Sequence, residues 1–278
     1  MGSYLRPASM DEALSALDAL PRTVLAGGTD IYPARVGRVM DDDVLDISGL
    51  PDLRTITVAD GVCRIPAQAT WSDLLRHDLP PAFDGVKAAA RAVGGIQIQN
   101  RGTICGNVCN ASPAGDGMPN LMALAAHVEL RSTTSRREVP IDEFVEGNRR
   151  TSRRPDELVT GLLIRLPPGE VRSTFRKLGS RAYLVISIAM VAALVELGAD
   201  GHIMAARIVV GACSEVPLRI PAAEARLLGR VPARGLAAEI QATDLAHLTP
   251  IDDVRATAAY RREAALVLVR RAVADLAG

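Results

Sequence analysis

Aromatic residues are scarce in this sequence: Phe, Tyr and Trp together make up 3% of its 278 residues. The hydrophobic content of 48% consists mostly of Ala, Val, Leu and Ile, which is ample for a buried core. No hydrophobic run is long enough to cross a membrane, because the most apolar stretch, residues 183–197, spans about 15 residues. The first residues are polar and the next segment is amphipathic, so we expect no secretory signal peptide.

An excess of either charge is also missing, because 32 Lys and Arg balance 32 Asp and Glu. A protein that binds nucleic acid through its phosphates needs a basic surface, so this composition argues against such a partner. One short basic cluster is present, and we interpret it as a solvated loop or a subunit contact. It consists of Arg149, Arg150, Arg153 and Arg154.

Cysteine is rare too. Four cysteines do not make a dense disulfide framework, so we expect a protein of the reducing cytoplasm. Cys105 and Cys109 stand four residues apart, but the other two are distant in sequence, and two thiolates are too few for a zinc or iron–sulfur site. The four histidines form no motif, which leaves no argument for a catalytic triad or a metal centre.

The hydrophobic pattern predicts an α+β chain, and its length exceeds the usual size of a single core. We therefore predict a first domain over residues 1–169, with two subdomains that meet near residue 55, and a second domain over residues 170–278. The predicted helices are 9–20, 71–77, 85–93, 119–126, 141–145, 222–228, 233–242 and 255–277. The predicted strands are 23–26, 43–47, 53–58, 62–65, 128–131, 137–140, 157–166, 173–178, 185–197 and 206–210.

A strand that ends in two glycines is the first segment with chemical content. Residues 25–30 read Leu-Ala-Gly-Gly-Thr-Asp. Two glycines let the backbone turn sharply and bring its N–H groups against an anion without interference from a Cβ atom. The segment suits a diphosphate, although a Gly-Gly turn is also a common structural feature. It is neither a Rossmann fingerprint nor a P-loop, because G-x-G-x-x-G and Gly-Lys-Ser/Thr are both absent there.

A long stretch of small and polar residues follows at 94–116, with five glycines and three asparagines. A packed core gains little from such a composition. A backbone wrapped closely around a large polar ligand would use all of it: glycine for close approach, Asn and Thr for hydrogen bonds, and Asp116 for the hydroxyls of a sugar or ribityl chain. A structural loop is the alternative.

Three segments together resemble a known family. Residues 26–30 (AGGTD), 101–107 (RGTICGN) and 111–116 (ASPAGD) are similar, in order and spacing, to the FAD-binding subunit of the xanthine dehydrogenase and carbon monoxide dehydrogenase family of molybdenum hydroxylases. Residues 175–179, 252–256 and 260–262 resemble the C-terminal domain of that family. The resemblance implies an FAD-binding domain of the p-cresol-methylhydroxylase/vanillyl-alcohol-oxidase type, followed by an α+β domain of a small sheet with helices.

The resemblance also implies which residues would hold FAD without a covalent link. Backbone N–H groups of the first loop would wrap the diphosphate against a second wall. Asp116 would hold ribityl or ribose hydroxyls, and Leu163 or Ile164 would contact the adenine. Lys177 would approach the flavin ring and stabilise its anionic reduced form; a surface lysine is the alternative. The first loop comprises Leu25, Ala26, Gly27, Gly28, Thr29, Asp30 and Ile31, and the second wall comprises Gly102, Thr103, Gly106, Asn107, Cys109 and Asn110.

One position departs from the family pattern, which usually has Gly-Gly-Asn where this chain has Cys105-Gly106-Asn107. A side chain at position 105 stands where the backbone runs close to the cofactor. We therefore expect Cys105 either to point away from FAD or to disturb that contact. These loops contain no His, and covalent attachment is not expected.

The functional implication of the resemblance is electron transfer. Such a subunit takes electrons from 2Fe–2S clusters in a small subunit, which receives them from a large subunit with molybdopterin, and passes them to an external acceptor. This chain has no cysteine pattern for those groups, so both partners would be separate chains, arranged as a dimer of heterotrimers. Two alternatives stay open: a stand-alone FAD-dependent oxidase or dehydrogenase with Tyr183 beside the flavin, and a scaffold protein that has lost FAD.

Overall fold

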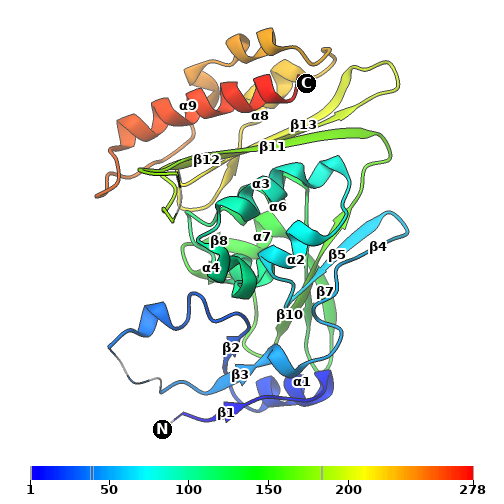
Figure 1. Cartoon of the computed structure of the whole chain (residues 1–278), viewed down its shortest axis with the longest axis vertical. Coiled ribbons are helices and arrows are strands. Elements are labelled where there is room, and N and C mark those ends of the chain that lie inside the picture. Colours follow the sequence, from blue (N-terminus) through cyan, green and yellow to red (C-terminus); the bar gives the residue numbers. More distant parts are fainter. Residues whose placement is uncertain (1, 38, 40, 183, 278) are drawn as a thin grey trace.

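The computed structural model describes residues 2–37, 39, 41–182 and 184–277. Its secondary structure forms three groups that follow one another along the long axis of the molecule (Figure 1). A small N-terminal sheet lies at one end, a five-stranded sheet with several helices occupies the middle, and a four-stranded sheet beneath two helices forms the other end. No helix in the described part of the chain is long and apolar enough to cross a membrane.

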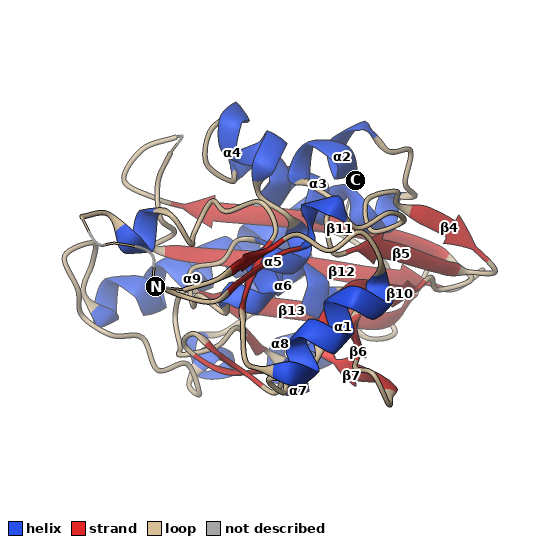
Figure 2. Ribbon diagram, turned by 90° about the horizontal axis from the view of Figure 1, so that it is seen from below, coloured by secondary structure: helices blue, strands red, loops and turns tan. Residues whose placement is uncertain are grey.

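The N-terminal group is a parallel three-stranded sheet of order β1-β3-β2. Ser9 is the N-cap of its helix α1, and the Ser9 hydroxyl accepts a hydrogen bond from the backbone N–H of Glu12. The helix buries one apolar face (Figure 2 shows it in front of the middle sheet). The elements are β1 (Tyr4–Leu5), α1 (Met10–Ala19), β2 (Thr23–Leu25) and β3 (Val44–Asp46).

The middle group is an antiparallel sheet of order β4-β5-β10-β6-β7. The hairpin between β4 and β5 turns at Asp60 and Gly61, and both residues have the positive φ that a tight two-residue turn requires. Its strands are β4 (Thr57–Ala59), β5 (Val62–Pro66), β6 (His127–Arg131), β7 (Arg136–Pro140) and β10 (Leu158–Arg165). Around them lie α2 (Trp71–Arg76), α3 (Asp84–Ala92), α4 (Ile96–Arg101), α5 (Ile104–Asn110), α6 (Gly117–Ala123), α7 (Ile141–Phe144) and the small pair β8 (Val145–Gly147) and β9 (Arg150–Thr151).

Residues 189–197 of the most apolar run form strand β12 in the C-terminal group. Strand β12 is buried on both faces: Met190, Ala192 and Leu194 pack into the core shared with the middle group, whereas the alternate residues pack into a second core beneath α8 and α9. The sheet has the order β11-β12-β13-β14. Its elements are β11 (Glu170–Leu178), β12 (Ala189–Leu197), β13 (Ile203–Gly211), β14 (Leu218–Arg219), α8 (Pro221–Leu227) and α9 (Ala258–Asp275).

Two predicted segments differ in the structure. Residues 98–119, expected as a loop around a ligand, contain most of α4 and all of α5. The reason is local: the Thr103 hydroxyl caps α5 by accepting from the N–H of Gly106, and Ala111 ends the helix in the left-handed conformation. The predicted helix 233–242 is a short 3-10 helix, Arg234–Glu239, which contains a glycine. The other predicted helices and strands are present, with ends that differ by a few residues.

Candidate cofactor site

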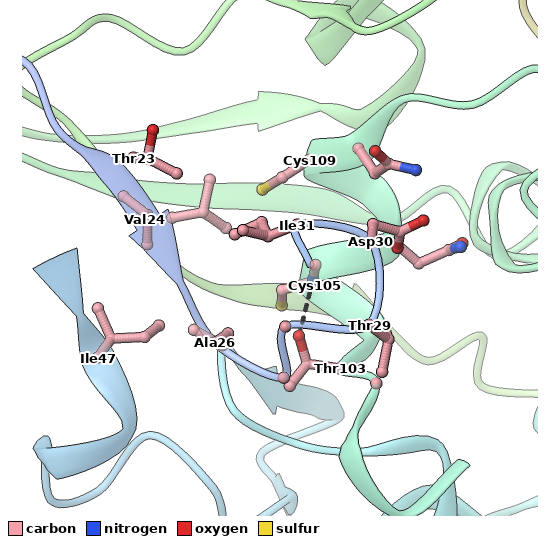
Figure 3. A pocket seen from close by; sticks show the side chains of 18 of the residues that line it. Thr23, Val24, Ala26, Thr29, Asp30, Ile31, Ile47, Thr103, Cys105 and Cys109 are labelled. Atoms are coloured by element: carbon pink, nitrogen blue, oxygen red, sulfur yellow. Dashed lines mark hydrogen bonds between the residues drawn. The ribbon is translucent and has the colours of Figure 1, made fainter. Parts of the chain in front are cut away.

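A cavity of about 530 Å³ opens where the N-terminal group meets the middle group. Strand β2 and the loop after it form one wall, and α5 forms the facing wall, with the start of β10 beside it. Figure 3 shows Thr29, Asp30 and Ile31 on the loop, opposite Thr103, Cys105 and Cys109 on the other wall. The two segments singled out in the sequence therefore face each other across this cavity.

The two walls touch so closely that glycine is required at their contact. A Cβ atom on Gly27 would lie 1.9 Å from the carbonyl oxygen of Arg101, which is a backbone atom that cannot move aside. Gly28 has a φ of +75°, and a Cβ atom there would lie 2.6 Å from the ring of Tyr32. Gly27 thus allows the two walls to come into close contact, and Gly28 allows the left-handed turn that follows.

Free backbone donors line the loop wall. The N–H of Tyr32 donates to the carbonyl of Gly28 at 3.2 Å and closes the loop into a turn. The N–H groups of residues 27–31, by contrast, donate to no acceptor among the described residues. Consecutive free N–H groups on a turn form a concave site for an anion, so this wall can hold phosphate oxygens.

The facing wall contains an unpaired polar atom. The side-chain oxygen of Asn107 is buried and has no hydrogen-bond partner among the described residues. A buried polar atom without a partner costs free energy. This oxygen lies toward Gly115 and Gly117, which do not line the cavity, so it marks a tightly packed part of the wall and not a contact for a ligand.

Cys105, the departure from the family pattern, lines the cavity but is only 2% exposed. Its Sγ lies 3.6 Å from the carbonyl oxygen of Ile65 on β5. Burial raises the pKa of the thiol well above its usual value, so the side chain is neutral. The thiol therefore packs against the middle sheet and leaves the cavity open.

Positive charge gathers at the cavity from arginines that no sequence motif brings together. Arg22, Arg35 and Arg153 all contribute to the lining. Arg35 forms an ion pair with Asp42 at 2.7 Å. These arginines come from separate parts of the chain, and no local pattern joins them. The short basic cluster that includes Arg153 was a signal, but we interpreted it as a solvated loop or a subunit contact.

Most of the predicted site residues line this cavity, and five do not. Leu25 and Ile164 are buried in the protein, and Leu163 is 9% exposed. Strand β10 reaches the cavity with Leu158 and Val159 at its beginning instead. The residues that line it are Ala26, Gly27, Gly28, Thr29, Asp30, Ile31, Gly102, Thr103, Gly106, Asn107, Cys109 and Asn110, and those outside the lining are Leu25, Asp116, Leu163, Ile164 and Lys177.

Asp116 and Lys177 lie outside the lining but contact each other. The Lys177 ammonium donates to a carboxylate oxygen of Asp116 at 2.5 Å, and the hydroxyl of Ser187 donates to the other oxygen at 2.6 Å. Burial raises the pKa of Asp116, and the charge of Lys177 opposes that rise. Lys177 and Ser187 belong to the C-terminal group. Their contacts with Asp116 therefore connect that group to the end of the stretch of small and polar residues at 94–116. Tyr183 lies outside the described residues.

The geometry defines a protein that binds a large phosphorylated cofactor. Free N–H groups, tight glycine contacts and guanidinium groups all suit a dinucleotide. Two family matches identify it: residues 1–168 match the FAD binding domain in molybdopterin dehydrogenase, and residues 173–276 match the CO dehydrogenase flavoprotein C-terminal domain. The chain therefore belongs to the FAD-binding subunits of the molybdenum hydroxylase family, and it is an FAD-dependent oxidoreductase subunit.

Individual relatives match over most of their length. The chain is 30% identical to the glyceraldehyde dehydrogenase medium chain of Sulfolobus acidocaldarius, covering 99% of this chain and 98% of that one. It is 32% identical to the nicotinate dehydrogenase FAD-subunit of Eubacterium barkeri, covering 81% and 79%. A solved carbon monoxide dehydrogenase from Hydrogenophaga pseudoflava, which lacks the Mo-pyranopterin moiety of its molybdenum cofactor, superposes with a TM-score of 0.87 at 27% identity, covering 99% and 96%. The fold class predicted from the sequence is confirmed.

Proposed function

We propose that this chain holds one FAD non-covalently in the cavity and works as the electron-transfer subunit of a molybdenum hydroxylase. The observation that carries the proposal is the row of N–H groups at residues 27–31, which have no acceptor among the described residues and belong to a loop that lines the cavity opposite the second wall, in a chain whose residues 1–168 match an FAD binding domain. When bound, FAD accepts and releases one or two electrons, so it can link single-electron carriers to two-electron acceptors.

The cavity supports a placement of the cofactor. The diphosphate lies against the loop wall and against Gly102, Thr103 and Gly106, where free N–H groups and glycines let phosphate oxygens approach. Leu158 and Val159 at the start of β10 would offer the adenine apolar contacts from within the cavity lining. The remaining residues of both walls surround the phosphates and the sugars.

In this proposal, Asp116 and Lys177 also hold two parts of the chain together. Their ion pair connects the end of the second motif to β11, so it holds the C-terminal group against the domain that binds the cofactor. We propose that the C-terminal group covers the flavin ring from this position. Lys177 would then lie beside the flavin ring, with its ammonium group held by the Asp116 carboxylate.

The partners follow from the relatives. Those named above are a medium chain, an FAD-subunit and an enzyme with a molybdenum cofactor. We propose that this chain joins a small subunit with 2Fe–2S clusters and a large subunit with molybdopterin, as a dimer of heterotrimers in the cytoplasm. Electrons enter from the small subunit and leave for NAD, oxygen, a quinone or another acceptor.

The first experiment is an absorption spectrum of the purified chain before and after addition of FAD. We expect flavin bands near ~450 nm that are released as free FAD on denaturation. A folded chain that takes up no FAD, alone or with its partner subunits, would contradict the proposal. Hydroxylation of a substrate by the chain without partners would contradict the subunit role and would favour the stand-alone enzyme.

A further inference from the structure

Of the three arginines that line the cavity, Arg153 stands out by its partners. Arg35 is ion-paired with Asp42. Arg22 donates to the hydroxyl of Ser3 and to the carbonyl oxygen of Ala16. Arg153 donates only to backbone carbonyls, and no carboxylate among the described residues pairs with it. Its positive charge is therefore not neutralised by an acidic partner.

The backbone holds this guanidinium in place from one side. Nη1 of Arg153 donates to the carbonyl oxygens of Glu157 at 2.7 Å, Arg154 at 3.1 Å and Pro155 at 3.5 Å. These carbonyls belong to the turn between β9 and β10, so the side chain is fixed against its own loop. Nε and Nη2 donate to no described residue, and they remain available to a ligand in the cavity.

Arg153 and Cys109, which is near the end of α5, both line the cavity. Surrounding protein atoms raise the pKa of the Cys109 thiol to about 11, although the residue as a whole is exposed, and the charge of Arg153 acts against that rise. The guanidinium therefore lies near the end of the second wall. A ligand between the two walls would meet free N–H groups on one side and this cation at the end.

We propose that Arg153 binds the diphosphate of FAD and makes the cavity select phosphorylated ligands over riboflavin. This inference rests on the proposed function. A guanidinium matches the geometry of two phosphate oxygens, and a cation already held by carbonyls loses little side-chain entropy on binding. Charge-assisted hydrogen bonds of this kind are stronger than neutral ones, so removal of Arg153 will weaken phosphate binding specifically.

The test compares four variants of the full chain. Arg153→Ala removes the side chain, and Arg153→Gln keeps a donor for the turn carbonyls without the charge. Arg153→Lys keeps the charge but lacks the planar set of N–H donors of a guanidinium group. Arg154→Ala is the matched control, because Arg154 is the adjacent arginine, is exposed and does not line the cavity. FAD, ADP and riboflavin are titrated against each variant by flavin fluorescence and calorimetry, and thermal unfolding confirms that each variant is folded.

We expect Arg153→Ala and Arg153→Gln to weaken FAD and ADP by about 10- to 100-fold. The affinity of the Arg153 variants for riboflavin should stay within about twofold of the wild type, as should the affinity of Arg154→Ala for all three ligands. Arg153→Lys should recover part of the lost affinity for FAD and ADP. Added salt should weaken FAD binding more in the wild type than in Arg153→Gln.

The inference fails if folded Arg153→Gln binds FAD as tightly as the Arg154→Ala control. It also fails if Arg153→Ala and Arg153→Gln weaken the binding of riboflavin and FAD equally, because Arg153 would then support the shape of the pocket without contacting the phosphates. If the wild type binds neither FAD nor ADP, both alone and with its partner subunits, the proposed function itself fails, and this outcome is distinct from the other two.

Discussion

At the scale of single residues, the site depends on a position where no side chain fits. Gly27 meets the backbone of the second wall, and the nearest atom is a carbonyl oxygen that is fixed within its own peptide. The contact brings two segments about 75 residues apart in sequence together at the cavity. A change here therefore acts on the position of both walls.

Gly27→Ala should destabilise the protein by about 1–3 kcal/mol through overpacking and should weaken FAD binding by about tenfold or more. Thermal unfolding and FAD titration measure the two effects. Gly235→Ala is the control, because a Cβ atom there meets nothing within 4 Å. Equal FAD affinity in both variants would show that the contact between the walls is not needed for binding.

Cys105 makes a second prediction at this scale. Because its thiol is buried against Ile65, Cys105→Gly restores the family pattern but leaves a gap and places glycine within α5. We expect a loss of about 1–2 kcal/mol in the free energy of unfolding. FAD affinity should change by less than about threefold, since the side chain points into the core. A large gain in FAD affinity would instead show that Cys105 obstructs the site.

At the scale of elements, one carboxylate joins four strands of the middle sheet. Glu129 on β6 is buried, and it accepts hydrogen bonds from Thr160 on β10 and Arg64 on β5, both at 2.7 Å. Arg136 on β7 pairs with its other oxygen. Burial by itself would raise the pKa of Glu129, but these partners outweigh it, and the pKa lies below its usual value.

Glu129→Gln should lower the free energy of unfolding by about 2 kcal/mol at neutral pH, a figure reduced because both arginines are partly exposed. A lowered folded-state pKa means that the charge stabilises the protein above the unfolded pKa, and that this stabilisation is lost as the pH falls below about 4.3. The difference between wild type and variant should therefore shrink toward pH 3.

Urea unfolding at pH 7 and at acidic pH measures this difference. Glu138→Gln is the matched control, because Glu138 lies on β7 in a more exposed ion pair with Arg165. The control should change stability by less than about 0.5 kcal/mol. A variant that is destabilised equally at both pH values would show that shape, not charge, matters at this position.

At the scale of the whole molecule, β12 belongs to two cores at once. One face packs with the middle group and the other beneath α8 and α9. We propose that residues 1–169 and 170–278 are two domains, joined at the exposed Pro168 and Gly169. The shared core and the pair between Asp116 and Lys177 then hold them together after the linker is cut.

A protease site inserted at Gly169 tests this arrangement. We expect cleavage to give two fragments that remain associated in size-exclusion chromatography and keep FAD bound. Met190→Ala should loosen the association, since Met190 faces the shared core, and the free energy of unfolding should fall by about 2–4 kcal/mol. Val191→Ala is the control. Val191 lies on the opposite face of β12, so its truncation leaves a gap in the second core and not in the core that the two fragments share. Fragments that separate at once would contradict a shared core.

The amino-acid sequence by itself determined the local features of this protein. Capping residues set the starts of α1 and α2, Asp60-Gly61 set a hairpin, and the two glycine-rich segments indicated the cofactor. Such features need only neighbours in sequence, so local physics decides them. The two motifs were also specific enough to indicate the family.

Only the tertiary structure decided which residues meet. Arg153 reaches the cavity, Leu158 and Val159 line it in place of Leu163 and Ile164, and Asp116 turns to Lys177. Each outcome depends on strand register or on packing between segments far apart in sequence, and no local pattern encodes it. The resemblance of the two motifs to a known family thus implied FAD, and the packing of distant segments decided which side chains line the cavity.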